Sequence, residues 1–446
     1  MKRPRALVLA EAANPEWTSV PLVGWSHCHA LSQAVDTHVV TQVRNTDAII
    51  RAGWQQGREF TAIDTEELAR PLWYIDRVLR NLGFGWTTTT ALANVSYRGF
   101  ERRVWDSFGA RITAHEFDLV HRLTPVSPTI PSPIARRCKL AGVPFVWGPV
   151  NGGVAWPRQF GRVRVREGEW LSYLRDAHKL LPGYASTRMN ASAIIIGSRD
   201  TWAQMPSQHH SRCIYIPENA IDPARFPITQ RSQHRASLPL RLAFVGRLVP
   251  YKGADMLIEA AAPLVCRGLV HVDVIGDGPE RERLLALAAT LGCRTGIEFP
   301  GWIEHGELHA RLGKSDVFAF PSIREFGGGV VLEAMALGLV PIVVDYAGPS
   351  ELVSEQTGIK IPLDTREGIV TSIRAHIERL VDEPELLANI GARARARAMT
   401  LFTWEAKARQ MVEVYRWVLG ERSKPDFGMP FPELVTEPER LAVSSA

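Results

Sequence analysis

Cysteine is scarce in this chain and forms no pattern. Five cysteines occur among 446 residues, they are scattered, and no Cys-x-x-Cys motif is present. An odd and dispersed set argues against a disulfide framework and against a structural zinc site. A reducing compartment suits such a composition.

Long hydrophobic runs are also missing. The longest apolar stretch, Val330–Ala347, carries Glu333 and Asp345 and contains Pro341. It therefore predicts a buried helix followed by a strand rather than a membrane span. The apolar run after the basic start Met1–Arg5 is too short for a signal peptide. We expect a cytoplasmic chain whose contact with a membrane, if it has one, is peripheral at the inner face.

Neither sign of charge dominates. Charged residues make up 22% of the chain, hydrophobic residues make up 46%, and the formal net charge is +5. This balance predicts a folded protein, and the length predicts two domains or more. A mild basic excess favours phosphate-bearing ligands, anionic lipid or nucleic acid, without choosing among them.

Short apolar runs typical of strands alternate with longer amphipathic segments typical of helices. Runs that are apolar throughout indicate strands covered on both faces, as in parallel sheets. Candidate strands are Arg5–Ala10, Thr37–Arg44, Asp118–Leu123, Pro144–Val150, Ala193–Gly197, Leu240–Gly246, Val270–Ile275, Asp316–Pro321 and Pro341–Val344. Candidate helices include Asp255–Leu264, Glu280–Leu291, Val330–Leu337 and Glu385–Met399. The alternation predicts doubly wound α/β domains.

A polar, proline-containing stretch over residues 223–239 interrupts this pattern. We take it as a linker between an N-terminal domain over 1–222 and a C-terminal domain over 240–402. The predicted fold class is α/β, with two Rossmann-like domains facing across a cleft. The tail over 424–446 is rich in proline and glutamate, and we expect it to be loosely ordered.

A glycine-rich stretch after the predicted strand Asp316–Pro321 carries two glutamates, Glu325 and Glu333, eight residues apart. Glycines at a strand-to-helix turn let backbone N–H groups approach an anion such as a diphosphate. Two carboxylates at the same edge could accept hydrogen bonds from the hydroxyls of two different sugars. Helix capping by Glu325 and stabilisation of Glu333 by the helix dipole is the alternative.

Two cations, Arg247 and Lys252, follow the predicted strand Leu240–Gly246. Together they could neutralise a diphosphate and stabilise it as a leaving group. The alternative is a loop with two solvent-facing cations. A further strand-to-helix turn, Gly276–Glu280, could also admit a ligand, or serve only as a tight turn.

The second half of the chain resembles the retaining glycosyltransferases of family 4, which have the GT-B fold. Matching motifs occur in order over about residues 240–363. They are Gly246-Arg247…Lys252-Gly253, Gly276-Asp277-Gly278-Pro279-Glu280, Gly301-Trp302 and Glu325…Glu333 followed by Ala-Met-Ala.

This resemblance implies a role for each matching residue. Arg247 and Lys252 would bind the donor diphosphate beside the Gly276 turn, and both cations, with Glu325 and His121, would form the catalytic set. Glu333 would hold the ribose and Glu325 the transferred sugar, neither acting as general acid or nucleophile. The remaining donor-binding positions would be Phe326, Gly327 and Gly328 at the sugar and phosphate, Trp302 and Ile303 at the base, and Gly24 near the diphosphate.

The resemblance also implies the reaction. A hexosyl group would pass, with retention, from a UDP- or GDP-sugar to a hydroxyl of a glycan, a lipid-linked or a small-molecule acceptor. No metal and no cofactor is expected, and no Asp-x-Asp motif follows the donor motifs. A helix over 403–423 would cross back to the first domain, which would bind the acceptor.

The first half carries weaker signals. Val23–His27 is the best match to a glycine-containing loop after the first strand, and Gly24 is its glycine. His121 ends a predicted strand within Asp118-Leu119-Val120-His121. It could bond a donor hydroxyl or handle the acceptor proton, or it could be a strand-end histidine satisfied by the backbone. The basic, aromatic segment Arg158–Lys179 could dock on an anionic membrane or form an ordinary solvated helix face.

Rival functions stay open beside this reading. A GT-B epimerase uses a nucleotide sugar without transferring it, and a non-catalytic regulator would keep nucleotide affinity without turnover. A phosphorylase would need a lysine for pyridoxal phosphate, and no pattern calls for one. No basic-aromatic module predicts binding to nucleic acid.

Overall fold

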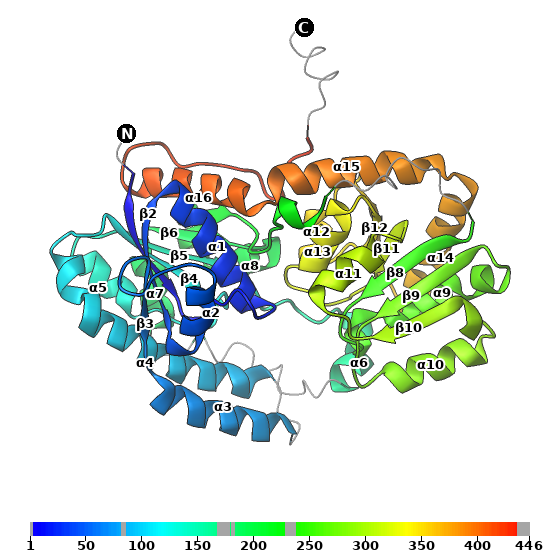
Figure 1. The fold of residues 1–446 in the computed structure, drawn as a ribbon, viewed down its shortest axis with the longest axis horizontal. Coiled ribbons are helices and arrows are strands. Elements are labelled where there is room, and N and C mark those ends of the chain that lie inside the picture. The colour runs from blue at the N-terminus through cyan, green and yellow to red at the C-terminus, as the bar shows by residue number, and fades with distance from the viewer. Residues whose placement is uncertain (1–2, 82–85, 167–178, 180–182, 228–237, 435–446) are drawn as a thin grey trace, which may run out of the picture. The chain divides into compact units, whose positions relative to one another are not determined.

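The computed structural model describes residues 3–81, 86–166, 179, 183–227 and 238–434 (Figure 1). Within them the strands form two parallel sheets of seven and six strands. Contacts divide the chain into two compact units. Unit 1 comprises 1–154, 161–220 and 404–427, and unit 2 comprises 155–160, 221–403 and 428–446. Two Rossmann-like α/β units confirm the predicted fold class, and each is described by itself.

The sheet of unit 1 has the strand order β3-β2-β1-β4-β5-β6-β7. The chain starts at the centre, moves to one edge and returns to build the other half, so its helices cover both faces. The strands are β1 (Arg5–Ala10), β2 (Asp36–Gln42), β3 (Phe60–Ile63), β4 (Leu119–Thr124), β5 (Phe145–Val150), β6 (Ala193–Ile196) and β7 (Cys213–Tyr215). β1, β2, β4, β5 and β6 match predicted strands within two residues, whereas β3 and β7 are additional.

The helices of unit 1 include a long pair that no sequence pattern predicted. α3 (Glu66–Asn81) and α4 (Trp86–Thr113) pack against each other. α3 contains Pro71 and exposes Trp73, although its apolar side chains gather along one face of the helix. The others are α1 (Val20–Ala34), α2 (Thr46–Arg51), α5 (Ile134–Leu140), α6 (Gly161–Arg166), α7 (Tyr184–Asn190) and α8 (Arg199–Gln204).

The last helix of the chain, α16 (Trp404–Val418), belongs to unit 1 and packs on α1. Met411 and Tyr415 are fully buried and share one core cluster with Trp25 of α1. The Tyr415 hydroxyl lies 2.6 Å from Nδ1 of His121 on β4. A residue more than 290 positions away thus ties α16 to the central sheet.

The sheet of unit 2 has the order β10-β9-β8-β11-β12-β13. This is the order of a dinucleotide-binding Rossmann fold, with its reversal between β8 and β11. The strands are β8 (Leu240–Val245), β9 (Val270–Ile275), β10 (Ile297–Gly301), β11 (Val317–Phe320), β12 (Val340–Val344) and β13 (Ile359–Ile361). β8, β9, β11 and β12 match predicted strands within two residues, whereas β10 and β13 are additional.

Seven helices are described in unit 2, and several begin where the sequence pattern placed them. They are α9 (Ala254–Cys266), α10 (Arg281–Thr290), α11 (His305–Leu312), α12 (Gly329–Ala336), α13 (Ala347–Leu352), α14 (Arg366–Asp382) and α15 (Glu385–Leu401). α12 carries no charged residue in its first turn and buries most of its side chains. Packing, rather than capping, therefore holds it in place.

The tail is not loosely ordered throughout, contrary to the prediction for 424–446. The chain re-enters unit 2 at Gly428, and Phe431 is 4% exposed. Its ring lies 5.4 Å from that of Phe402. Apolar burial and side-chain hydrogen bonds hold residues 428–433, a pattern that composition alone does not reveal. Residues 435–446 lie outside the described residues.

Two further expectations fall mainly on residues outside the description. The predicted linker 223–239 includes residues 228–237, and the basic segment Arg158–Lys179 includes residues 167–178. Its described start forms a 3-10 turn over Arg158–Phe160 and then α6. Membrane docking by this segment stays a prediction. Within the part of the chain that the structure describes, no helix is long and apolar enough to cross a bilayer.

Tyr415→Phe tests the anchor of α16. The change removes the hydroxyl bonded to His121 and leaves a buried ring nitrogen without its partner, so we expect a loss of about 1–3 kcal/mol in the free energy of unfolding. Urea-induced unfolding measures it. Tyr346→Phe is the matched control, because the hydroxyl of Tyr346 bonds an exposed carbonyl, that of Ala155, which water can satisfy instead. Equal effects of the two substitutions would contradict the role of the buried bond.

Candidate functional site

The predicted donor motifs gather at the carboxyl edge of the sheet of unit 2. β8 and β11 are neighbours in this sheet, paired through Val317 with Leu242 and Phe318 with Ala243. The connections from these two strands run to opposite sides, which leaves a crevice at their carboxyl ends in folds of this topology. The cation-bearing loop follows β8, and the glycine-rich loop follows β11. The fold therefore brings together residues that are more than 70 positions apart.

Backbone hydrogen bonds join the loops after β8, β9 and β10. The N–H of Gly246 donates to the carbonyl of Ile275 at 3.0 Å, and the N–H of Gly276 donates to that of Gly301 at 2.8 Å. Gly276 has a φ of +133°, and a Cβ there would lie 2.0 Å from the carbonyl oxygen of Gly246. Glycine is required because the two backbones are in contact. The Gly276 turn thus fixes the loop that carries Arg247.

Lys252 and Glu325 form an ion pair across the switch point. Their side chains are 16% and 18% exposed. The Lys252 ammonium also lies 5.1 Å from the centre of the Phe320 ring. The sequence assigned these residues to two different parts of a donor, whereas the ligand-free protein uses each to neutralise the other. A phosphate that binds Lys252 must therefore compete with the Glu325 carboxylate.

Arg247 is arranged differently. Its side chain is exposed at the end of β8, and it makes no ion pair within the described ranges. The backbone around it is fixed, because the N–H of Leu248 donates to the carbonyl of Asp277 at 2.9 Å. A cation with an exposed head on a fixed backbone suits an incoming anion.

Glu333 points to a partner that sequence reasoning missed. Its Oε2 lies 3.6 Å from Nε2 of His309 on α11, and the His309 ring lies 4.5 Å from the ring of Phe226. The Glu333 side chain is 17% exposed. It is therefore partly open to solvent, and its contact with His309 helps to hold the carboxylate in place. A lone histidine in a helical pattern gives no local signal of this contact.

The glycine-rich loop after β11, residues 325–328, is named the donor loop here. The N–H of Phe326 donates to its neighbour's carboxylate, Oε1 of Glu325, at 3.2 Å. Gly327 and Gly328 are buried, and α12 begins directly after them. The N–H of Gly348 donates to the Glu325 carbonyl at 3.3 Å. α13 therefore packs against the backbone of the donor loop.

The proposed base-binding segment follows β10. Trp302 is 69% exposed, and Ile303 is half-buried. Gly301, just before them, accepts the hydrogen bond from Gly276. The same turn that fixes Arg247 thus also fixes the backbone beside Trp302.

Trp156 is a neighbour of the donor motifs that the sequence did not reveal. The segment 155–160 belongs to unit 2, although it follows β5 of the first sheet. The Arg324 guanidinium lies 4.8 Å from the centre of the Trp156 ring, and the ring of Tyr251 lies 6.1 Å away. Arg324 and Tyr251 each flank one member of the Lys252–Glu325 pair in sequence. The contact is long-range, so no local pattern could indicate it.

Gly24 does not lie in a loop, contrary to the prediction. It is buried in α1, which runs from Val20 to Ala34. A Cβ on Gly24 would lie 2.0 Å from the carbonyl oxygen of Ala12. The chain turns earlier, over residues 11–19, before the helix begins. The role of Gly24 in this structure is close packing of α1 against the loop after β1.

His121 is fully buried in unit 1. Its Nε2 lies 2.5 Å from the Gly148 carbonyl, and its Nδ1 is engaged by Tyr415. Burial lowers the pKa of His121 to about 4. Both ring nitrogens are engaged. This arrangement matches the alternative prediction, in which His121 is a strand-end histidine whose hydrogen bonds are satisfied by its surroundings. As placed here, His121 offers nothing to a sugar hydroxyl or an acceptor proton.

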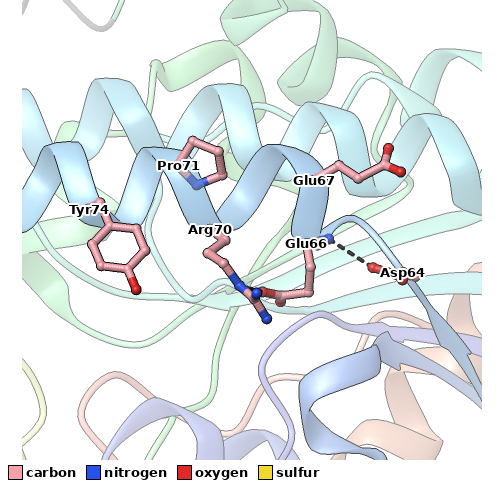
Figure 2. A pocket seen from close by; sticks show the side chains of 6 residues that line it. All are labelled: Asp64, Glu66, Glu67, Arg70, Pro71 and Tyr74. Carbon is pink, nitrogen blue, oxygen red and sulfur yellow. Dashed lines mark hydrogen bonds and ion pairs between the residues drawn. The ribbon is translucent and has the colours of Figure 1, made fainter.

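Unit 1 has a cavity that the sequence did not predict. It has a volume of about 520 Å³ and lies beside the first turns of α3 (Figure 2). Acidic, basic and aromatic side chains line it: Asp64, Glu66, Glu67, Arg70, Pro71 and Tyr74. Carboxylate oxygens and an aromatic ring can contact the hydroxyls and the apolar face of a sugar. This cavity does not contain the donor motifs, which lie in unit 2.

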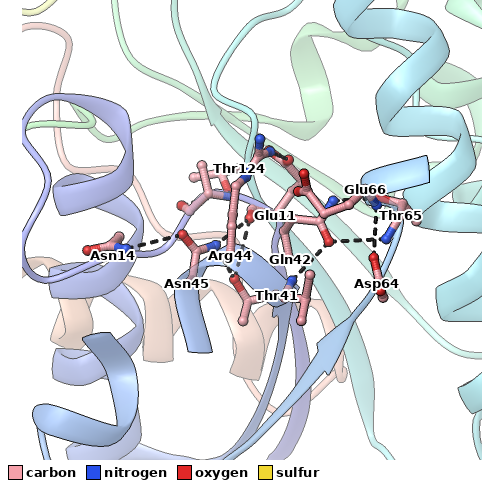
Figure 3. Close-up of polar contacts among 12 residues, drawn as sticks. Glu11, Asn14, Thr41, Gln42, Arg44, Asn45, Asp64, Thr65, Glu66 and Thr124 are labelled. Atoms are coloured by element: carbon pink, nitrogen blue, oxygen red, sulfur yellow. Dashed lines mark hydrogen bonds and ion pairs between the residues drawn. The ribbon is translucent and has the colours of Figure 1, made fainter. Parts of the chain in front are cut away.

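A polar network closes the loop after β1 at the carboxyl edge of the first sheet (Figure 3). Asn45, which is fully buried, donates to the Glu11 carbonyl at 2.9 Å and to Oγ1 of Thr41 at 2.9 Å. Thr124 bonds both backbone groups of Ala12 at 3.0 and 3.1 Å. The sequence predicted a glycine-containing loop after the first strand. Buried polar side chains hold the loop here instead.

One group of side chains in the described ranges has metal-ligand proximity, and it lies away from the donor loop. His271, Asp273 and Glu298 come together on β9 and β10. Arg311 bonds both carboxylates, and its hydrogen bond to Glu298 holds the pKa of that carboxyl below the usual range. The guanidinium thus already supplies the positive charge that this group needs.

Comparison with known proteins agrees with the geometry. Residues 228–397 match the family described as glycosyl transferases group 1. The alpha-D-kanosaminyltransferase of Streptomyces kanamyceticus is 28% identical over 224 residues, which cover 48% of this chain and 56% of the relative. The chain spans about half the length of the curated relatives that it matches.

Solved structures share the fold over nearly the whole chain. Anabaena HepE in complex with UDP and glucose has a TM-score of 0.58 and 17% identity, covering 92% of this chain and 98% of that one. Sucrose-phosphate synthase from Thermosynechococcus elongatus has a TM-score of 0.61 and 17% identity, covering 94% and 100%. These likenesses establish the GT-B fold.

Gly276→Ala tests the contact between the two loops. A Cβ would meet the Gly246 carbonyl in a backbone conformation that alanine rarely adopts, so we expect a loss of about 2 kcal/mol or more in the free energy of unfolding. Gly306→Ala is the matched control, because a Cβ there meets nothing within 4 Å and alanine favours the helix. Thermal melts compare the two. A Gly276→Ala protein as stable as the control would contradict the contact.

His121→Asn tests the neutral, buried state of His121 through pH. The pKa of about 4 in the folded protein lies below the usual 6.5 of an unfolded chain. The unfolded state therefore binds more protons between these values, and stability falls as pH drops from about 6.5 to about 4, by up to about 3 kcal/mol from this group. Urea titrations at several pH values should show a shallower slope for His121→Asn. Identical slopes of the unfolding free energy against pH in the two proteins would contradict the low pKa of His121.

Proposed function

We propose that this chain, whose residues 228–397 form a group 1 glycosyl transferase domain, is a retaining glycosyltransferase. It moves a hexosyl group from a UDP- or GDP-sugar to a hydroxyl of a glycan, lipid-linked or small-molecule acceptor. The observation that carries this proposal is the meeting of Arg247, Lys252 and the donor loop at the switch point of the second sheet. A relative of this fold, HepE, binds UDP and glucose.

The two cations take the negative charge that develops on the leaving diphosphate. Arg247 approaches from the exposed end of β8, and Lys252 exchanges Glu325 for a phosphate oxygen. Because Lys252 is paired before the donor arrives, the site has no unpaired buried charge when it is empty. We propose that the two cations, Arg247 and Lys252, take the place of a metal ion, so that transfer continues in EDTA.

Glu325, released from Lys252, accepts hydrogen bonds from the transferred sugar, and Glu333 accepts them from the ribose. The Phe326, Gly327 and Gly328 backbone lies against the sugar and phosphate. The base lies beside Trp302 and Ile303, with the Gly276 turn fixing that backbone. Each role needs only a hydrogen-bond acceptor or a backbone N–H, and none needs a titrating side chain.

Retention follows from attack on the face that the leaving group departs from. The bond between the anomeric carbon and the phosphate oxygen breaks, and the acceptor oxygen bonds to the same carbon. The acceptor proton passes to the departing phosphate oxygen, which Arg247 and Lys252 stabilise. Neither Glu325 nor Glu333 acts as a nucleophile, and His121, whose ring nitrogens are both engaged within unit 1, takes no part in the step.

The acceptor is proposed to bind unit 1. The cavity beside α3 offers the carboxylates of Asp64, Glu66 and Glu67 and the half-exposed ring of Tyr74. These groups suit a polyhydroxylated ligand better than an anionic one. The acceptor therefore presents sugar hydroxyls here, whether it is free or lipid-linked.

Arg247→Ala and Lys252→Ala test the proposal. Each removes a charge that is needed more in the transition state than in the ground state, so kcat/KM should fall more than tenfold, on the order of 1.4 kcal/mol or more. Saturation-transfer NMR first identifies which nucleotide sugar binds. Release of UDP or GDP from that donor then measures turnover. Lys314→Ala, an exposed lysine in the same unit, is the control.

The outcomes separate the rival functions. Near-normal turnover in both variants would refute the roles of Arg247 and Lys252. Nucleotide binding without release in the presence of any acceptor would favour a non-catalytic regulator. Conversion of the donor into an isomer without an acceptor would favour an epimerase.

A further inference from the structure

A buried guanidinium in unit 2 binds three backbone carbonyls from two distant segments. Arg397, on α15, is 1% exposed. Its Nε donates to the Leu352 carbonyl at 3.0 Å. Its Nη1 and Nη2 donate to the carbonyls of Pro432 and Phe431 at 2.7 and 2.8 Å. A charge this deeply buried is tolerated only where such partners are fixed.

Two of these carbonyls belong to residues 428–433, named the C-terminal strap here. The chain leaves unit 2 at Thr403, forms α16 in unit 1 and re-enters unit 2 with the strap. Phe431 packs its ring 5.4 Å from that of Phe402, and Oγ of Ser354 donates to the Glu433 carboxylate at 2.8 Å. The strap is thus held by apolar burial, by a side-chain hydrogen bond and by Arg397.

The third carbonyl, that of Leu352, ends α13. This helix has six residues, all buried, and runs from Ala347 to Leu352. Its other end touches the donor loop: the N–H of Gly348 donates to the Glu325 carbonyl at 3.3 Å, and a Cβ on Gly348 would lie 1.8 Å from the Phe326 carbonyl oxygen. One short helix therefore has Arg397 at its end and the donor loop at its beginning.

We propose that the C-terminal strap and Arg397 position the donor loop through α13. Neither Arg397 nor the strap is described in contact with the Lys252–Glu325 pair, so both act as positioning elements rather than catalytic residues. The strap fixes the position of the Arg397 guanidinium, which in turn fixes the last carbonyl of α13. Through its contacts with Glu325 and Phe326, α13 then fixes the position of the donor-loop backbone. The functional consequence rests on the proposed donor-binding role of this loop.

A chain that ends at Phe427 tests the proposal, with a chain that ends at Leu434 as its matched control. The first lacks the strap and the second keeps it. Phe431→Ala and Arg397→Lys are milder variants, which keep the proposal testable if the shorter chain folds poorly. Arg397→Lys retains the charge but cannot reach three carbonyls at once.

Hydrogen–deuterium exchange gives a readout that does not depend on activity. Without the strap, or with Arg397→Lys, exchange should quicken in peptides spanning 325–329 and 347–352 and stay unchanged in β1 (Arg5–Ala10) of unit 1. In the control that ends at Leu434, the exchange rates of both peptides should match those of the full chain. Faster exchange confined to residues 397–402, with the donor loop unchanged, would overturn the proposal.

Donor kinetics give the second readout. The KM for the donor should rise about fivefold or more without the strap, while kcat changes less than twofold. A peptide of residues 428–434, added in excess to the chain that ends at Phe427, should lower the KM again. An unchanged KM in a folded variant would overturn the proposal. If the full chain turns over no nucleotide sugar, the proposed function fails, and the exchange experiment still decides whether the strap orders the loop.

Discussion

The reversal of strand order between β8 and β11 is the constraint on which the donor site depends. Connections that leave neighbouring parallel strands for opposite faces cannot fill the space at their carboxyl ends. Gly276 then lets the loops after β8 and β9 touch, because no side chain separates it from the Gly246 carbonyl. The backbones of Arg247 and of the donor loop owe their placement to these two features.

Electrostatics adds a second condition to this geometry. A cation placed for a diphosphate is costly to bury while the site is empty. Pairing Lys252 with Glu325 removes that cost, and it couples the two halves of the proposed donor: the phosphate that takes Lys252 frees Glu325 for the sugar. A nucleotide without a sugar would free the carboxylate and leave it without a hydroxyl partner. If these residues bind the donor as proposed, the pair favours the complete donor over the nucleotide alone.

Local patterns in the sequence predicted the parts of this account that depend on local chemistry. Parallel strands, the two-unit fold and the donor motifs all follow from apolar runs and glycine-rich turns. Gly24 was misplaced because a glycine after a first strand does not reveal that the helix has already begun. The partners His309 and Trp156 were missed because their contacts join distant segments. α3 was missed although its apolar residues recur at helical spacing, because Pro71 lies inside the helix, where proline usually ends one.

The central claim is that the switch point of unit 2 binds a nucleoside diphosphate through Arg247 and Lys252. Calorimetric titration of the full chain with UDP and GDP, each compared with its monophosphate, tests it most directly. The account predicts that one diphosphate binds at least tenfold more tightly than its monophosphate, and that Arg247→Ala removes most of this difference. Equal affinities for mono- and diphosphate, or a preference that survives Arg247→Ala and Lys252→Ala, would contradict it.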